Sequence, residues 1–159
     1  MEQGWALCRK QEYEIEICRA AAERVYNTPR AGEVYNYLED VTERVAEPCY
    51  VARGTVGELY VVPRPKMKAY DVDPDLVGEE WMKVRTQPTA NLYYCRPIVG
   101  EAEIGTSYGV MHANRVGVPH GAGDRLVCMA LPAEGGYRPD EADCWVVNGE
   151  VFERTYRLV

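Results

Sequence analysis

The sequence predicts an α+β fold, in which an N-terminal helical hairpin packs on a mainly antiparallel β-sheet or a partly open small barrel. Apolar residues recur at helical spacing over residues 12–47, and short β-rich stretches separated by Gly and Pro clusters fill residues 49–159. Helices that precede a run of strands are typical of α+β proteins. At 159 residues, the chain is expected to form a single domain over residues 1–159.

Two apolar stripes predict the helical hairpin. After a short strand at residues 4–8, a first helix is expected over residues 12–27, with one face formed by Ile15, Cys18, Ala22, Val25 and Tyr26. A second helix is expected to begin at Pro29, capped by Thr28, and to continue to about Ala46, because Pro48 then ends it. Its apolar face is formed by Val34, Tyr35, Leu38, Val41 and Val45.

The rest of the chain reads as strands. They are predicted at residues 50–53, 58–62, 67–72, 84–86, 91–95, 108–111, 125–130 and 144–147. Gly54 and Gly57 favour a tight connection between the first two of these strands. No internal repeat is evident. Short strands with frequent turn signals favour an antiparallel sheet or a partly open barrel.

Charge and composition exclude some classes of function. The net charge is −7 and the sequence contains no basic run, so direct nucleic-acid binding is not expected. An acidic surface suits a basic partner, although acidity also favours solubility alone. The chain shows neither a signal-peptide pattern nor an apolar run of about 20 residues, so a cytoplasmic protein without a membrane association is expected.

The six cysteines are scattered and form no C-x-x-C pair, which argues against a zinc ribbon and against a redox motif. Reduced, mostly buried thiols are expected instead. Asp71, Asp73 and Asp75 resemble the start of a calcium loop, but Leu76 stands where the loop needs glycine and Met82 where it needs glutamate. A solvated turn is therefore the favoured interpretation, and no metal is expected.

A catalytic interpretation rests on the two histidines, His112 and His120. Either could act as a general base near neutral pH, with Asp124 as its orienting partner. Ser107 could complete a nucleophile–base–acid set, but no Gly-x-Ser-x-Gly elbow supports that assembly. Turn or surface histidines explain the same residues without chemistry.

A ligand-binding interpretation rests on aromatic and polar side chains of the β-rich module. The chain holds 12 tyrosines, and a tyrosine ring with its hydroxyl suits a binding surface. The candidate ligand-binding residues are Tyr93, Tyr108, His120 and Arg125. The glycine-rich segments at 105–109 and 121–123 lack the lysine of a phosphate loop and read as turns, so no cofactor is expected.

Three segments carry a resemblance to a known type of domain. They are Pro65–Asp73, a basic, proline-containing opening strand; Gly123–Val127, a Gly-Asp-apolar strand; and Phe152–Tyr156, a closing Phe-x-x-Thr-Tyr signature, with Trp145-Val146-Val147 before it. Over residues 63–159 the chain resembles a small β-rich domain of unknown biochemical activity that is common in tailed-phage and prophage genomes. The helical part lies outside the resemblance, and residues 135–143 form a longer, more acidic turn than is usual there.

The resemblance implies a phage- or mobile-element-encoded protein and brings no catalytic residues with it. We therefore expect a non-catalytic binding or accessory protein, for example an anti-defence inhibitor that acts on a host protein or sequesters a small nucleotide-like ligand. One alternative is a small hydrolase or transferase that uses His112 or His120 with Asp124, or an acid from residues 134–143. Another is a structural or assembly protein that forms a homo-oligomer.

Overall fold

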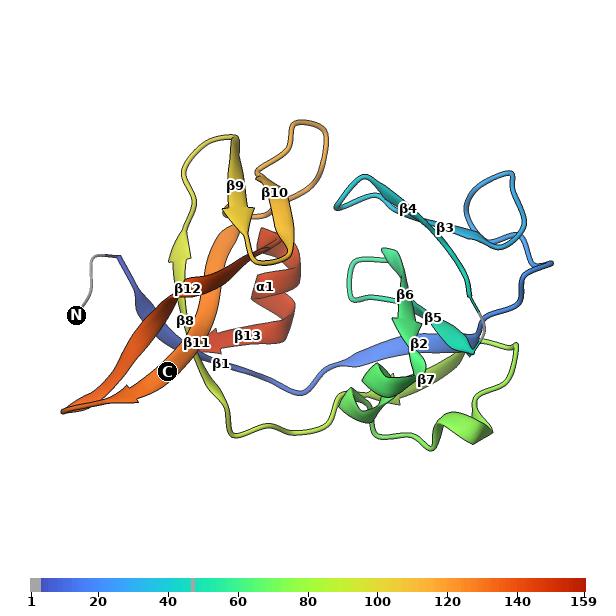
Figure 1. Ribbon diagram of the computed structural model, residues 1–159, viewed down its shortest axis with the longest axis horizontal. Helices are drawn as coiled ribbons and strands as arrows, with labels where there is room; N and C mark the ends of the chain where they lie inside the picture. The colour runs from blue at the N-terminus through green and yellow to red at the C-terminus, as the bar shows by residue number, and fades with distance from the viewer. Residues whose placement is uncertain (1–3, 47) are drawn as a thin grey trace. The chain divides into compact units, whose positions relative to one another are not determined.

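Strands dominate the computed structural model, which describes residues 4–46 and 48–159 (Figure 1). The chain forms two compact units. Unit 1 comprises the chain up to Gln11 together with Thr89–Val159, and unit 2 comprises Glu12–Pro88. The boundary predicted near residue 48, between a helical and a β-rich part, is therefore not where the chain divides. That both units act as one domain stays a prediction.

Unit 2 is built on a four-stranded antiparallel sheet. The strands lie in the order β6-β5-β2-β7, with bounds Leu59–Pro63, Cys49–Arg53, Glu14–Arg19 and Met82–Arg85. A separate hairpin of β3 (Glu33–Asn36) and β4 (Val41–Arg44) lies between β2 and β5 in the chain. Two 3₁₀ turns, η1 (Arg64–Ala69) and η2 (Pro74–Leu76), connect β6 to β7.

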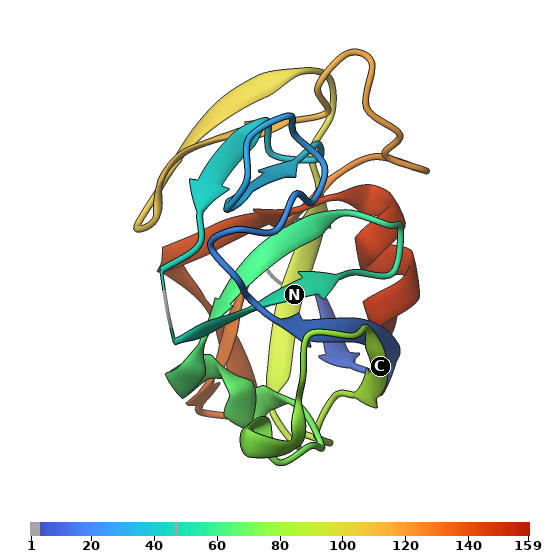
Figure 2. The same ribbon diagram turned by 90° about the vertical axis from the view of Figure 1, so that its right-hand side faces the viewer.

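Unit 1 is built on a five-stranded antiparallel sheet. The strands lie in the order β12-β11-β8-β1-β13, with bounds Gly136–Val147, Arg125–Ala133, Leu92–Pro97, Ala6–Lys10 and Tyr156–Leu158. A second hairpin, β9 (Ala102–Thr106) with β10 (Gly109–Ala113), lies between β8 and β11 in the chain. The helix α1 (Gly149–Thr155) follows β12 and lies along one face of this sheet (Figures 1 and 2).

The predicted helical hairpin over residues 12–47 is wrong, because its first part is the strand β2 and its second part is the β3–β4 hairpin. In β2 the pattern alternates: Glu14 is exposed, whereas Ile15 and Ile17 are buried. This period of two is that of a strand, and Cys18 on the opposite face of β2 is also buried, in a second cluster. The second predicted helix is interrupted at Asp40, whose φ of 54° places it in the left-handed region and turns the chain into β4.

Most of the predicted strands are confirmed, with ends that differ by a few residues, except that β12 begins at Gly136 and so includes most of the segment 135–143 that was expected to be a turn. The strand predicted at residues 67–72 is wrong, since this segment begins in the 3₁₀ turn η1 and only Tyr70 pairs, in a single bridge with Thr86. Pro65 fixes its own φ and lacks an N–H, which favours a turn at this point over a ladder. The strand β9 and the helix α1 were not predicted.

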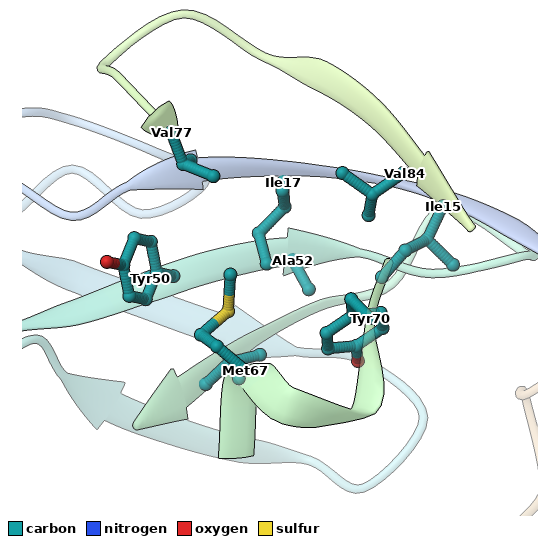
Figure 3. Packing of buried hydrophobic residues seen from close by; sticks show 9 residues of the cluster. Ile15, Ile17, Tyr50, Ala52, Met67, Tyr70, Val77 and Val84 are labelled. Atoms are coloured by element: carbon teal, nitrogen blue, oxygen red, sulfur yellow. The ribbon is translucent and has the colours of Figure 1, made fainter. Parts of the chain in front are cut away.

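One apolar cluster forms the core of unit 2 (Figure 3). Met67 of η1 is fully buried at the centre of this cluster, and the other side chains of the cluster lie around it. Ile15 and Ile17 of β2 contribute the sheet side of this cluster, and Tyr70 covers it from the segment after η1. The 3₁₀ turn is therefore held in place by the burial of one methionine.

The corresponding cluster of unit 1 joins α1 to its sheet. It comprises Cys8, Tyr93, Cys95, Val127, Phe152 and Tyr156. Phe152 and Tyr156 stack with ring centroids 5.0 Å apart, which confirms the prediction that they anchor this part of the chain. The other face of the sheet is covered by a second cluster around Trp5, whose Nε1 donates to Glu141 Oε1 at 3.0 Å. All six cysteines are free, and five of them are buried.

We predict that Met67→Ala lowers the free energy of unfolding by about 2–5 kcal/mol, because it leaves a cavity beneath the sheet of unit 2. Urea denaturation followed by tyrosine and tryptophan fluorescence measures the change. Leu76→Ala is the matched control, since Leu76 is 74% exposed and its truncation removes little packing. Equal losses in the two variants would contradict the central place of Met67.

Glu58 is a buried carboxyl group beside the turn that joins β5 to β6. It is 7% exposed, and its Oε1 accepts the Val56 N–H at 3.2 Å. Burial raises the pKa of Glu58 above its ordinary value, and the charge of Glu39 raises it further. The folded chain therefore holds this proton more tightly than the unfolded chain does.

Because the folded-state pKa is raised, ionised Glu58 lowers stability as pH rises from the ordinary pKa of 4.5 through the raised value. We predict that Glu58→Gln, which keeps an acceptor for Val56, is more stable than wild type at pH 7. The difference disappears below about pH 4, where the carboxyl is protonated in both states. Denaturant midpoints between pH 4 and 8 test this, with the exposed Glu80→Gln as control; a pH-independent difference would contradict it.

Candidate functional site

The residues singled out by the sequence all lie in unit 1, on four neighbouring pieces of chain. Tyr93 lies in β8, Tyr108 at the turn between β9 and β10, and His112 in β10. His120 and Asp124 lie in the connection that leads from β10 to β11, and Arg125 is the first residue of β11. The sheet and its hairpin thus place the candidates in one region of the unit, and their contacts decide what each can do.

Asp124 is a clamp for the backbone. Its Oδ2 accepts the Asn114 N–H at 2.8 Å and its Oδ1 accepts the Gly149 N–H at 2.9 Å, while its own N–H donates to Asn114 Oδ1 at 2.7 Å. The residue is 5% exposed. These bonds tie the end of β10 to the start of α1 and confirm that Asp124 caps backbone amides before β11. Both carboxylate oxygens are occupied, which leaves Asp124 poorly placed to orient a histidine.

The segment before Asp124 packs closely on the start of α1. Asn148 caps this helix by accepting the N–H groups of Glu150 and Val151, and its Nδ2 donates to Pro119 O at 2.9 Å. A Cβ at Gly149 would lie 1.9 Å from the carbonyl oxygen of His120, so only glycine fits there. The His-Gly-Ala-Gly-Asp segment, residues 120–124, is therefore a packing loop whose backbone supports the helix.

The two histidines have different surroundings. His112 Nε2 lies 3.0 Å from Glu101 Oε2, and both side chains are partly exposed. His120 has a buried Nδ1 without a hydrogen-bond partner in the part of the chain that the structure describes. Ser107, the candidate nucleophile, instead donates its hydroxyl to Asp143 Oδ1. His112, Ser107 and Asp124 thus each contact different partners, and these contacts do not assemble the nucleophile–base–acid set.

The candidate ligand-binding residues meet in a row of aromatic rings. Trp145 of β12 makes edge-on contacts with Tyr93, at 6.2 Å between ring centroids, and with Tyr108, at 6.5 Å. The Arg125 guanidinium lies 5.1 Å from the ring centroid of Phe152 and donates to Gly123 O. Tyr93 is 6% exposed, so Tyr93 and Arg125 serve the core, and Tyr108 alone of these residues presents a largely free ring at 70% exposure.

Sequence reasoning missed three further exposed apolar side chains in the connection that contains Tyr108. Val99, Val110 and Val116 are 94%, 72% and 83% exposed. With Tyr108 they form what we call the 99–116 surface, which comprises these four residues in the connection between β8 and β11. Their position in the sequence could have indicated their exposure. These valines lie in a segment rich in glycine and charged residues, and a hairpin with one buried face cannot bury all of them.

Three carboxylates lie near this hairpin. Glu103 lies in β9, Glu101 immediately precedes β9 and contacts His112, and Asp143 accepts the hydroxyl of Ser107. Arg115 is the one basic residue among positions 99–116 apart from the titratable His112. The 99–116 surface is therefore apolar with a mainly acidic border. Such a border favours approach by a positively charged surface.

We predict that Asp124→Ala lowers the free energy of unfolding by about 2–4 kcal/mol, because two backbone N–H groups then lose a charged acceptor. Thermal and urea unfolding measure the loss. Asp71→Ala is the matched control, since the Asp71 side chain is exposed. If Asp124 were instead a catalytic group with little structural role, its replacement would leave stability unchanged.

Comparisons of the chain with protein-family models, with curated proteins and with solved structures found no match. Within the described residues, no helix has both the length and the apolar character required to cross a membrane.

Proposed function

We propose that the chain is a non-catalytic binding protein, of the kind that phages and other mobile elements encode, and that it docks on a host protein through the 99–116 surface. The observation that carries this proposal is that four apolar side chains are exposed along one connection of unit 1. Exposed apolar surface of this kind is typical of interaction sites. Their hairpin is held by a buried frame, as binding loops commonly are.

The partner that fits this surface is a cytoplasmic protein with an apolar depression and a basic rim. Tyr108 offers a ring and a hydroxyl on a hairpin turn, and such tyrosines are frequent anchors at interfaces. Glu101 and Glu103 would face lysines or arginines of the partner, which matches the net charge of −7. Burial of one valine side chain contributes about 1.5–3 kcal/mol, so a few such contacts suffice for a stable complex.

The other interpretations have less support. Catalysis by His112 or His120 with Asp124 would need a carboxylate that is not already bonded to two backbone amides. A small ligand held by Tyr93 and Arg125 would need side chains that the core already uses. The exposed hairpin suits a macromolecular partner better than a small one, because it projects side chains and does not enclose a volume.

We predict that Val110→Glu weakens partner binding at least tenfold, because it places a charge within the apolar part of the interface. Cross-linking from a photoreactive residue at position 108 in the full chain identifies the partner, and titration of the purified partner then gives the dissociation constants. Leu76→Glu, at an equally exposed position of unit 2, is the matched control and should bind as wild type does.

The salt dependence gives a second readout, since an acidic border on a basic partner predicts weaker and slower association as ionic strength rises. Equal effects of Val110→Glu and Leu76→Glu would contradict the proposal. A nucleotide that stabilises the chain, with no loss in the Val110→Glu variant, would favour the small-ligand interpretation instead. Cross-links only to a second copy of the chain would favour an assembly role.

A further inference from the structure

The two sheets have the same order of strands, although they are drawn from different parts of the chain. In unit 1 the order is β12-β11-β8-β1-β13, and in unit 2 it is β6-β5-β2-β7, followed by Tyr70, which bridges to Thr86 directly after β7. The connections also correspond. A hairpin separates β8 from β11 and β2 from β5, and a helical turn follows both β12 and β6.

The pairing registers make this correspondence specific to single residues. Cys8 pairs with Tyr93 in unit 1 as Val84 pairs with Ile15 in unit 2. Val127 pairs with Cys95 and Trp145, as Ala52 pairs with Ile17 and Tyr60. Lys10 pairs with Tyr156 as Thr86 pairs with Tyr70. When the two sheets are aligned strand by strand in this way, a paired residue of unit 1 has one equivalent residue in unit 2.

The two cores correspond under the same alignment. Five buried members of the unit 1 cluster fall on buried members of the unit 2 cluster, the pairs being Cys8 and Val84, Tyr93 and Ile15, Cys95 and Ile17, Val127 and Ala52, and Tyr156 and Tyr70. Phe152 and Met67 lie outside the ladders, and each is a buried apolar residue of the helical turn that precedes the closing tyrosine.

A glutamine makes two equivalent bonds in each unit, one from its backbone N–H and one from its side chain, and Gln11 Nε2 also donates to Arg154 O at 3.2 Å. Gln11 N donates to Thr155 O at 3.0 Å, and its Nε2 donates to Tyr156 O at 3.2 Å. Gln87 N donates to Ala69 O at 2.8 Å, and its Nε2 donates to Tyr70 O at 3.2 Å. Each glutamine follows an Arg-x dipeptide, Arg9-Lys10 or Arg85-Thr86, at the end of the inserted strand.

Taken in chain order, residues 6–70 and 82–158 supply the same series of elements: a strand, a second strand, a hairpin, two long-paired strands, a helical turn and a closing tyrosine. The first strand of each series nevertheless lies in the sheet of the other series. Strand β1 lies between β8 and β13, and β7 lies beside β2 and Tyr70.

We infer that the chain consists of two tandem copies of one module that exchange their first strands within the same molecule. Each sheet then carries a strand-binding site, between β8 and β13 or between β2 and Tyr70. The ligand class of that site is an extended segment that ends in Arg-x-Gln, and the glutamine is read by two backbone carbonyls. This inference is independent of the proposed function.

Strand exchange decides which part of the chain each first strand stabilises. Residues 6–11 stabilise residues 89–159 and not the segment that follows them in the chain. Without the exchange, β1 would pair with β2 and with the segment at Tyr70, and a change in β1 would loosen residues 12–88. Full-length variants at the two equivalent glutamines separate these arrangements, because each keeps its backbone bond and loses the side-chain bond to the closing tyrosine.

We expect Gln11→Ala to raise the hydrogen–deuterium exchange rates of the amides at residues 155–158 about three- to tenfold, with rates at residues 69–72 unchanged. Gln87→Ala should show the reverse pattern. Mass spectrometry of peptides from the intact, folded chain measures both, and each variant is the control for the other. Gln11→Ala removes two side-chain hydrogen bonds and Gln87→Ala removes one, and none of these bonds is fully buried, so both variants are expected to fold.

Faster exchange at residues 14–19 and 69–72 in Gln11→Ala would overturn the inference, since that is the pattern of an unexchanged chain. Size-exclusion chromatography with light scattering over a hundredfold range of concentration completes the test. A monomer with the expected exchange pattern supports exchange within one molecule. A concentration-dependent dimer with that pattern would overturn it, because β1 would then complete the sheet of a second copy.

Discussion

Unit 1 depends on the insertion of β1 between two strands from the far end of the chain. Strand β8 pairs with one edge of β1 and β13 with the other, so removal of β1 would leave the backbone groups of both neighbours without partners. Cys8, at the centre of β1, is fully buried against the side chains that support α1. The position of the helix, and with it the clamp at Asp124, follows from this one insertion. In unit 2 the strand β7 has the same place, with Val84 where unit 1 has Cys8.

Most residues that the sequence suggested as catalytic or ligand-binding have structural roles in the framework that these insertions create. Asp124 and the loop at 119–123 hold α1, and Tyr93 and Arg125 belong to the aromatic core. What the frame leaves outward is the β9–β10 hairpin with Tyr108 and Val110. In the equivalent hairpin of unit 2, β3–β4, Val34 is buried and Val41 is 43% exposed. The two copies of the module thus keep the same core and carry different side chains on their hairpins, and the surface that we propose for binding belongs to the hairpin of unit 1.

Local patterns in the sequence predicted the strands after residue 49, the turn at Gly123-Asp124 and the anchoring by Phe152 and Tyr156. They failed for Glu12–Ala46, because Ile15 and Cys18 fit a helical period as well as Ile15 and Ile17 fit a strand, and burial by β5 and β7 decides between them. Strand β1 pairs with strands more than 80 residues away in the chain. Such pairing leaves no pattern in the local sequence, so the place of β1 in the sheet could not be predicted. The repeat was present as Tyr60-Val61-Val62 and Trp145-Val146-Val147, but the equivalent residues are few and lie at unequal spacing. The sequence analysis placed Pro65–Asp73 and Phe152–Tyr156 at opposite ends of one domain. In the structure these segments include most of the equivalent helical turns, η1 and α1, of the two copies.

Translation produces β1 before both of its neighbours, β8 and β13. Residues 12–88 contain every strand of unit 2, so that unit can fold while residues 89–159 are still being added. At ordinary elongation rates this interval lasts on the order of ten seconds. During it, β1 is a free strand with two unpaired edges, and Leu7 and Cys8 lie next to Arg9 and Lys10, whose charges oppose association with other chains. A nascent chain stalled after residue 88 would therefore contain every strand of unit 2 together with β1, whose pairing partners in unit 1 have not yet been synthesised.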